Sequence, residues 1–214
     1  MSTIDYENIE CSICKETNRY PVLMSTNTFG GPDLDLRPAE MQRSTMDFWI
    51  QECPNCGYVA PYVSIESKIS SDFLKSDRYL TCEGINYISS LASTFYKHYL
   101  ISMEHDDIES AFYALLHAAW SSDDCGDIDN AILCRKKAIV LVDELIRNDD
   151  EDKDSLILIK ADLKRRAREF DDMDKEFEGI VFSEDLLNKI LKFQLAKAKE
   201  KDDSCYRVED VEKQ

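Results

Sequence analysis

Two cysteine pairs of the form C-x-x-C constrain this chain more than any other feature. The first pair is Cys11 and Cys14 in ECSIC, and the second is Cys53 and Cys56 in ECPNCGYVA. Each pair is expected to bend into a turn whose backbone N–H groups point at the sulfur atoms. Two such turns facing each other offer four thiolates in a tetrahedron, which is the ligand set that Zn²⁺ takes in structural sites.

The 38 residues between the pairs are compatible with one shared ion. Doubling a loop costs only about 0.6 kcal/mol, whereas structural zinc contributes roughly 10–16 kcal/mol in small domains. Pro54 stiffens the second turn, and Gly57 permits the tight reversal after it. With strands expected at 19–24, 47–52 and 57–63, the pattern predicts a zinc ribbon.

The ion is expected to be structural, because four cysteines close the coordination sphere and catalytic zinc keeps an open position. The sequence has no HExxH motif, and His98, His105 and His117 fall on or beside expected helices as packing or surface residues. A dithiol redox centre would need a strand-to-helix junction of an α/β fold, which these residues do not resemble. Iron instead of zinc, or cysteines without a ligand, remain open alternatives.

The prolines divide the chain into two segments. All five lie within the first 61 residues, and proline breaks helix interiors. We therefore expect an α+β protein that is predominantly α: a small N-terminal β zinc ribbon over 1–66, with a long insert between its knuckles, and an antiparallel helical domain over 67–214.

Helical periodicity supports the second segment. Asp106 with Glu109 is expected to begin a helix as a capping box, Gly126 to end it, Asp127 to cap the next and Ser183 to cap the last, with a polar connector at 148–154. Apolar stripes at helical spacing occur within 88–103, 108–119, 128–145, 156–170 and 186–193.

The helices carry a weak repeat signal. Ala119, Ala131 and Ala138 have the spacing of small residues in a tetratricopeptide unit. A second set fits less well and lies 42 residues further along; it consists of Ala161, Met173, Phe177 and Ile180. A tetratricopeptide-like array and a plain antiparallel bundle both remain open.

The insert between the knuckles contains DLDLR, with Asp33, Asp35 and Arg37 on one expected face. Paired carboxylates beside an arginine could bind a second metal or a polar ligand. The favoured interpretation is an edge strand whose acids pair with Arg37 and Arg43, while its two leucines pack on the helices.

The basic run KADLKRRAR at 160–168 could be a surface that binds an acidic partner or RNA. The favoured alternative is a solvated helix face paired with the acidic stretches 149–154 and 169–178.

The remaining cysteines show no ligand spacing and are expected to be core or surface thiols; they are Cys82, Cys125, Cys134 and Cys205.

Charge narrows the classes of partner. The formal net charge is −17, so the chain repels phosphate backbones and anionic membranes. The sequence shows no signal peptide and no membrane span. We therefore expect a soluble cytoplasmic protein whose cysteines are reduced. Phosphate-binding loops and the nucleophile elbow lack their motifs.

CSIC, DLDLRP, RSTMDFWIQECPNCGYVA and ADLKRRAREFDD together resemble a family of uncharacterised bacterial proteins, a domain of unknown function. Members of that family carry a split four-cysteine zinc ribbon followed by tetratricopeptide-like helices. The resemblance implies zinc binding through Cys11, Cys14, Cys53 and Cys56, and no catalytic residues. Ser12 departs from the family, whose first knuckle more often reads C-P-x-C, but both thiols are kept.

The expected function is therefore that of a non-enzymatic, cytoplasmic zinc protein that binds a protein or peptide partner through its helices. Two alternatives remain: a nucleic-acid-associated zinc ribbon, which the charge disfavours, and an enzyme that uses Asp33, Asp35 and Arg37.

Overall fold

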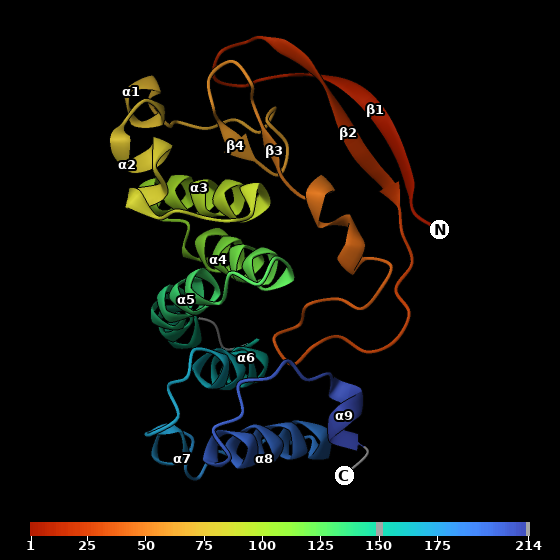
Figure 1. The fold of residues 1–214 in the computed structure, drawn as a ribbon, viewed down its shortest axis with the longest axis vertical. Coiled ribbons are helices and arrows are strands. Elements are labelled where there is room, and N and C mark those ends of the chain that lie inside the picture. Colours follow the sequence, from red (N-terminus) through yellow and green to blue (C-terminus); the bar gives the residue numbers. More distant parts are fainter. Residues whose placement is uncertain (149–151, 213–214) are drawn as a thin grey trace.

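A computed structural model describes residues 1–148 and 152–212. The chain is an α+β protein that is mainly helical, as the sequence predicts. Figure 1 shows the long helices stacked in one column, with the first 60 or so residues running along one side of that column. The segment that follows the hairpin descends this side and meets the C-terminal segment near α9.

The first element is a long antiparallel hairpin of β1 (Thr3–Glu10) and β2 (Thr17–Ser25). β2 contains the strand expected at 19–24, whereas β1 was not predicted. Seven of the eight β1 residues are exposed, so this strand lacks the alternation of apolar and polar residues by which a half-buried strand is recognised.

The strands expected at 47–52 and 57–63 were wrong in extent. Residues Arg43–Phe48 form a 3₁₀ helix, η1, and only β3 (Gln51–Glu52) and β4 (Val59–Ala60) pair as strands. One cause is that a side chain takes the place of a backbone carbonyl: Oε1 of Gln51 accepts the N–H of Val63 at 3.1 Å, so this N–H does not pair with the neighbouring strand. The second half of the ribbon therefore pairs through only two residues per strand, whereas the first knuckle closes the long β1–β2 hairpin.

The five predicted helices are present, and consecutive long helices pack against each other in chain order. They are α3 (Ser90–Glu104), α4 (Ile108–Asp124), α5 (Ile128–Asn148), α6 (Lys153–Arg166) and α8 (Asp185–Lys199). Short elements complete the array: α1 (Ser71–Leu74), α2 (Asp77–Leu80), η2 (Cys82–Gly84), α7 (Met173–Glu176) and α9 (Val208–Glu212).

Small residues allow the close approach of the helices. Ala119, Ala131, Ala138 and Ala161 are all fully buried, as their predicted interhelical positions require. The tetratricopeptide-like character of the array stays a prediction.

The predicted capping residues lie within one residue of the observed helix ends, but the fourth apolar stripe, 156–170, runs past the end of α6 at Arg166. Asp107, not Asp106, caps α4, because its carboxylate accepts the N–H of Ser110 and Asp106 has φ +54°. Gly126 follows α4 with φ +75°, as expected. Glu184, not Ser183, precedes α8. Asp127 directly precedes α5, as expected, and its carboxylate accepts the N–H of Ile88, before α3, at 3.1 Å.

The connector predicted at 148–154 is described only at its two ends. Residues 149–151 lie outside the described part, between the end of α5 and the start of α6.

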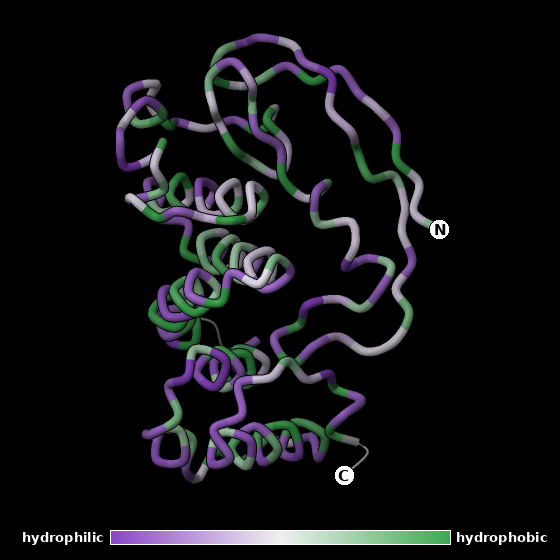
Figure 2. Tube along the Cα trace, viewed as in Figure 1, coloured by the Kyte–Doolittle hydropathy of each residue, from purple (hydrophilic) through white to green (hydrophobic). Residues whose placement is uncertain are grey.

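The buried apolar side chains form two clusters. The larger one runs from the ribbon through α3, α4, α5 and α6, and the smaller one joins α6, α7, α8 and α9 with Leu34 of the insert. Figure 2 shows that each long helix carries both hydrophobic and hydrophilic residues, as expected for amphipathic helices that pack in a row. Within the described ranges, no helix is both long and apolar enough to cross a membrane.

Candidate metal centre

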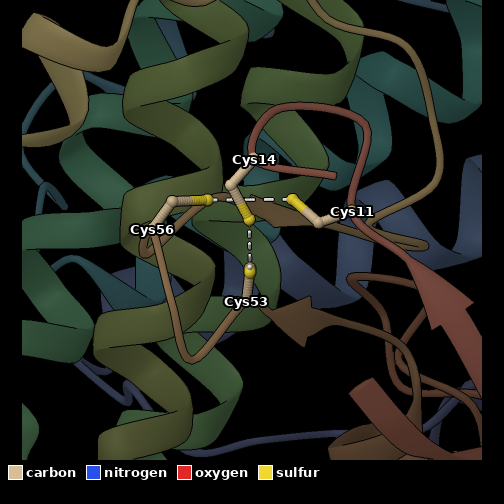
Figure 3. A group of neighbouring side chains, drawn as sticks. All are labelled: Cys11, Cys14, Cys53 and Cys56. Atoms are coloured by element: carbon tan, nitrogen blue, oxygen red, sulfur yellow. Dashed lines mark hydrogen bonds between the residues drawn. The ribbon is translucent and has the colours of Figure 1, made fainter. Parts of the chain in front are cut away.

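The four cysteines of the two predicted pairs come together at one point (Figure 3), and all their Sγ atoms lie within 4.8 Å of one another. The Sγ atoms of Cys11 and Cys56 are 3.7 Å apart, and those of Cys14 and Cys53 are 3.6 Å apart. A tetrahedral ion with Zn–S bonds of about 2.3 Å separates its sulfur ligands by about 3.8 Å. The thiols therefore already have the spacing of a tetrahedral site.

The two knuckles have the same backbone form. The N–H of Lys15 donates to the carbonyl of Cys11 at 2.9 Å, and the N–H of Gly57 donates to the carbonyl of Cys53 at 2.8 Å. Both donors have left-handed backbone, with φ +64° at Lys15 and φ +74° at Gly57. Gly57 was predicted for this role, whereas the lysine gave no sequence signal of it.

Backbone N–H groups stabilise thiolate at this point. Burial raises the pKa of Cys14 and of Cys56, and the N–H groups of Glu16 and Tyr58 oppose that rise. Burial also disfavours the Cys53 thiolate, but the N–H groups of Cys56 and Asn55 outweigh it and lower its pKa. Because thiolate is the form that binds metal, the turns support metal binding.

Hydrogen bonds from neighbouring residues tie both knuckles to the rest of the chain. The N–H of Ser12 donates to the carbonyl of Val63 at 2.9 Å, and the hydroxyl of Tyr79, in α2, donates to the carbonyl of Gly57 at 2.6 Å. Cys11 and Cys53 are buried, while Cys14 and Cys56 are half-buried. The knuckles thus contact each other and the helical array.

The donor set fits a structural zinc ion. Four sulfur ligands at tetrahedral spacing close the coordination sphere and leave no position for a substrate. Elsewhere in the described ranges, no group of His, Cys, Asp or Glu side chains has metal-binding geometry. The four residues predicted from spacing are therefore the ones that the fold brings together.

The predicted edge strand at DLDLR was wrong. Asp33 makes a single bridge with Arg207, and a turn follows in which Leu36 has φ +65°. Leu34 is buried as expected, but Leu36 is 48% exposed. The N–H of Leu34 donates to the carbonyl of Tyr206, so the C-terminal segment holds this turn in place.

The acids of this turn are buried and paired with arginines. Asp33 pairs with Arg43 at 2.6 Å, as predicted. Asp35, fully buried, instead accepts from Nε1 of Trp120 at 2.7 Å and from Arg166 at 2.8 Å. Burial disfavours the charged form of Asp35, but the neighbouring guanidinium groups outweigh it and lower its pKa.

This pairing extends into α4, α5 and α6. Arg37 donates to Asp124 at 2.9 Å, and Asp123 accepts from both Arg135 and Arg166. The carboxylates and Arg37 therefore do not converge in an open cleft, which was the geometry that catalysis by Asp33, Asp35 and Arg37 required.

The basic run at 160–168 is only partly the solvated face that was predicted. Lys160 and Lys164 do pair with Glu176 of the expected acidic stretch. Arg165 and Arg166 are buried instead, and Arg165 donates to Asp162 at 2.6 Å. Two of its positive charges hold the fold together and are not offered to a partner.

The remaining candidate ligands lie elsewhere. His105 caps α3 and forms a hydrogen bond with Ser67 at 2.8 Å, while His98 and His117 are half-buried between helices and ribbon. As predicted, Cys82 and Cys134 are core residues and Cys125 and Cys205 are exposed.

Comparisons of the chain with models of protein families, with curated proteins and with solved structures found no match. The resemblance to a bacterial family of unknown function therefore stays a prediction. The four-cysteine cluster is the feature on which a functional argument rests.

Proposed function

We propose that this chain is a zinc protein without catalytic activity, in which the ion fixes the ribbon so that the chain can bind another protein or a peptide. The observation that carries the proposal is the closed cluster of Cys11, Cys14, Cys53 and Cys56. Zinc is favoured over iron because four thiols at tetrahedral spacing are its usual structural ligand set. A cytoplasmic location belongs to the same proposal, since thiols stay reduced there.

The helical array offers one surface for a partner, and the hairpin offers a more specific one. Ile4, Tyr6 and Met24 are exposed on β1 and β2, and these strands form a sheet of only two. An open strand edge with exposed apolar side chains can accept an extended segment from another chain.

Metal analysis of the purified full-length chain tests the first half of the proposal. We expect about one zinc ion per chain and loss of the ion in Cys53→Ser, with Cys125→Ser, an exposed cysteine outside the cluster, as the matched control. Iron in place of zinc, or full zinc content in Cys53→Ser, would overturn the assignment.

Affinity purification from the native cell tests the second half. We expect a protein partner that is lost with Tyr6→Asp on the hairpin or with substitutions on the helical array, and retained with Val181→Asp, an exposed position between α7 and α8. A measured turnover without any protein partner would refute the non-enzymatic role. Salt-sensitive RNA or DNA binding at about 50 mM salt would favour the nucleic-acid alternative.

A further inference from the structure

A cavity of about 320 Å³ lies where the ribbon meets α3 and α4. Its walls include Trp49 after η1, Phe95 and His98 of α3, and Tyr113 of α4. This volume is at the lower end of the range for small-molecule sites, which are often concave, largely apolar and placed where two parts of a chain meet. The cavity is separate from the cysteine cluster.

Aromatic rings form the inner part of this cavity. The ring of His117 lies 5.3 Å from that of Trp49 and 4.9 Å from that of Phe95, in edge-to-face arrangements. These neighbours fix the imidazole in place. Aromatic walls of this kind favour a flat ring, and their π faces attract a cation.

The two ends of the cavity differ in polarity. Glu109, Tyr113 and His117 lie four residues apart along one face of α4 and all line the cavity, so its ends are about 12 Å apart along the helix. Glu109 is exposed and supplies a negative charge at one end. His117 supplies a neutral imidazole at the other, because burial lowers its pKa to about 4.

The inner end also has unused hydrogen-bonding capacity. Within the described part of the chain, the His117 side chain has ring contacts but no hydrogen-bond partner. Nδ1 of His98 is buried and has no hydrogen bond of good geometry among the described residues, although the ring lies close enough to the Val59 backbone for that group to raise its pKa against the effect of burial. A buried polar atom such as Nδ1 of His98 normally has a partner, and a ligand with a polar group at this end would supply one to it and to the half-buried His117.

We propose that this cavity binds a small aromatic amine. Its ammonium group pairs with Glu109, its ring lies among Trp49, Phe95 and Tyr113, and a hydroxyl or N–H at the far end of the ring bonds to His117. The net charge of −17 also favours a cation over an anion of the same shape.

Tyramine, an aromatic amine with a ring hydroxyl, is the probe that tests the proposal, titrated into the intact zinc-loaded protein and followed by NMR. We expect saturable shifts of the Trp49 indole N–H, at least about tenfold weaker binding of 3-(4-hydroxyphenyl)propionate, and weaker binding of phenethylamine, which lacks the hydroxyl. Absence of saturable shifts with tyramine at millimolar concentration, or equal binding of the propionate, would overturn the proposal.

Variants locate the binding. Glu109→Gln is expected to weaken tyramine binding by about tenfold, whereas Glu7→Gln, an exposed carboxylate on the hairpin, leaves it unchanged. Ser110→Trp places a large ring at a half-buried lining position and is expected to abolish binding, with circular dichroism as the check on its fold. Unchanged tyramine affinity in Glu109→Gln contradicts the proposal without any need for the bulkier variant.

Discussion

Position 57 requires a left-handed backbone that the other knuckle obtains with a lysine. A Cβ at Gly57 would meet only the ring of Tyr79, at 4.0 Å, so Gly57→Ala is expected to cost about 1–2 kcal/mol through its backbone alone. Lys15→Gly relieves the same backbone strain but raises the conformational entropy of the unfolded chain. The two effects oppose each other, so stability should change by less than about 1 kcal/mol. Guanidinium unfolding at saturating zinc measures both, and equal losses in the two variants would contradict this account.

The imidazole of His117, half-buried between α4 and the ribbon, makes stability depend on pH. Burial, followed by the nearby His98 and Arg37, lowers its pKa from 6.5 to about 4. Below pH 6.5 the unfolded chain takes up a proton that the folded chain refuses, so the free energy of unfolding falls as pH drops, by about 3 kcal/mol at pH 4. Above pH 6.5 this residue has no such effect.

His117→Phe isolates this contribution from acid-induced loss of metal, which affects both proteins alike. The stability difference between the original chain and the variant should shift in favour of the variant between pH 7 and pH 4.5. An equal difference at both pH values would show that the imidazole titrates normally.

Single residues were predictable where their signal is local. The four cysteines are recognisable because each ligand pair is three residues apart in the sequence. The left-handed state of Lys15 and the choice of Asp107 over Asp106 as cap depend on the exact path of the backbone, and either aspartate satisfies the sequence pattern.

At the scale of elements, the long helices were readable because their apolar stripes repeat over three or more turns. β3 and β4, with two residues each, are too short to show a period. The partners of the insert could not be predicted for another reason: Asp35 pairs with Arg166, which is 131 residues away in the sequence. Nothing local marks such a pairing, so a turn locked by α6 was mistaken for an edge strand.

The insert should depend on this buried pair. Asp35→Asn leaves the Arg166 guanidinium without one of its buried carboxylates, and breaking a buried ion pair costs about 3–5 kcal/mol. We expect that loss in guanidinium unfolding, together with faster proteolysis within 28–49. Asp47→Asn, on the exposed side of η1, is the control and should change little. Similar stability of the two variants would mean that the pair does not hold the insert.

At the scale of the whole molecule, the division predicted at residue 66 stays untested, and the two apolar clusters suggest how to test it. Ribbon side chains such as Tyr58 and Val59 share a cluster with Phe95 of α3, whereas Phe193 of α8 belongs to the other cluster. Loss of the ion should therefore propagate from the knuckles into α3 through β4, which packs on that helix.

Removing the metal with a chelator should expose these steps in order. Structural zinc contributes on the order of 10 kcal/mol to small sites, so backbone amides of 1–66 should lose hydrogen-exchange protection first and those of α3 next. Those of α8 (Asp185–Lys199) should keep theirs, since α8 packs on α6, α7 and α9. Cys53→Ser should reproduce this pattern without a chelator, and Cys125→Ser should not. If α8 loses protection together with the knuckles, the chain unfolds as one unit; if the knuckles keep theirs, the ion does not hold the ribbon.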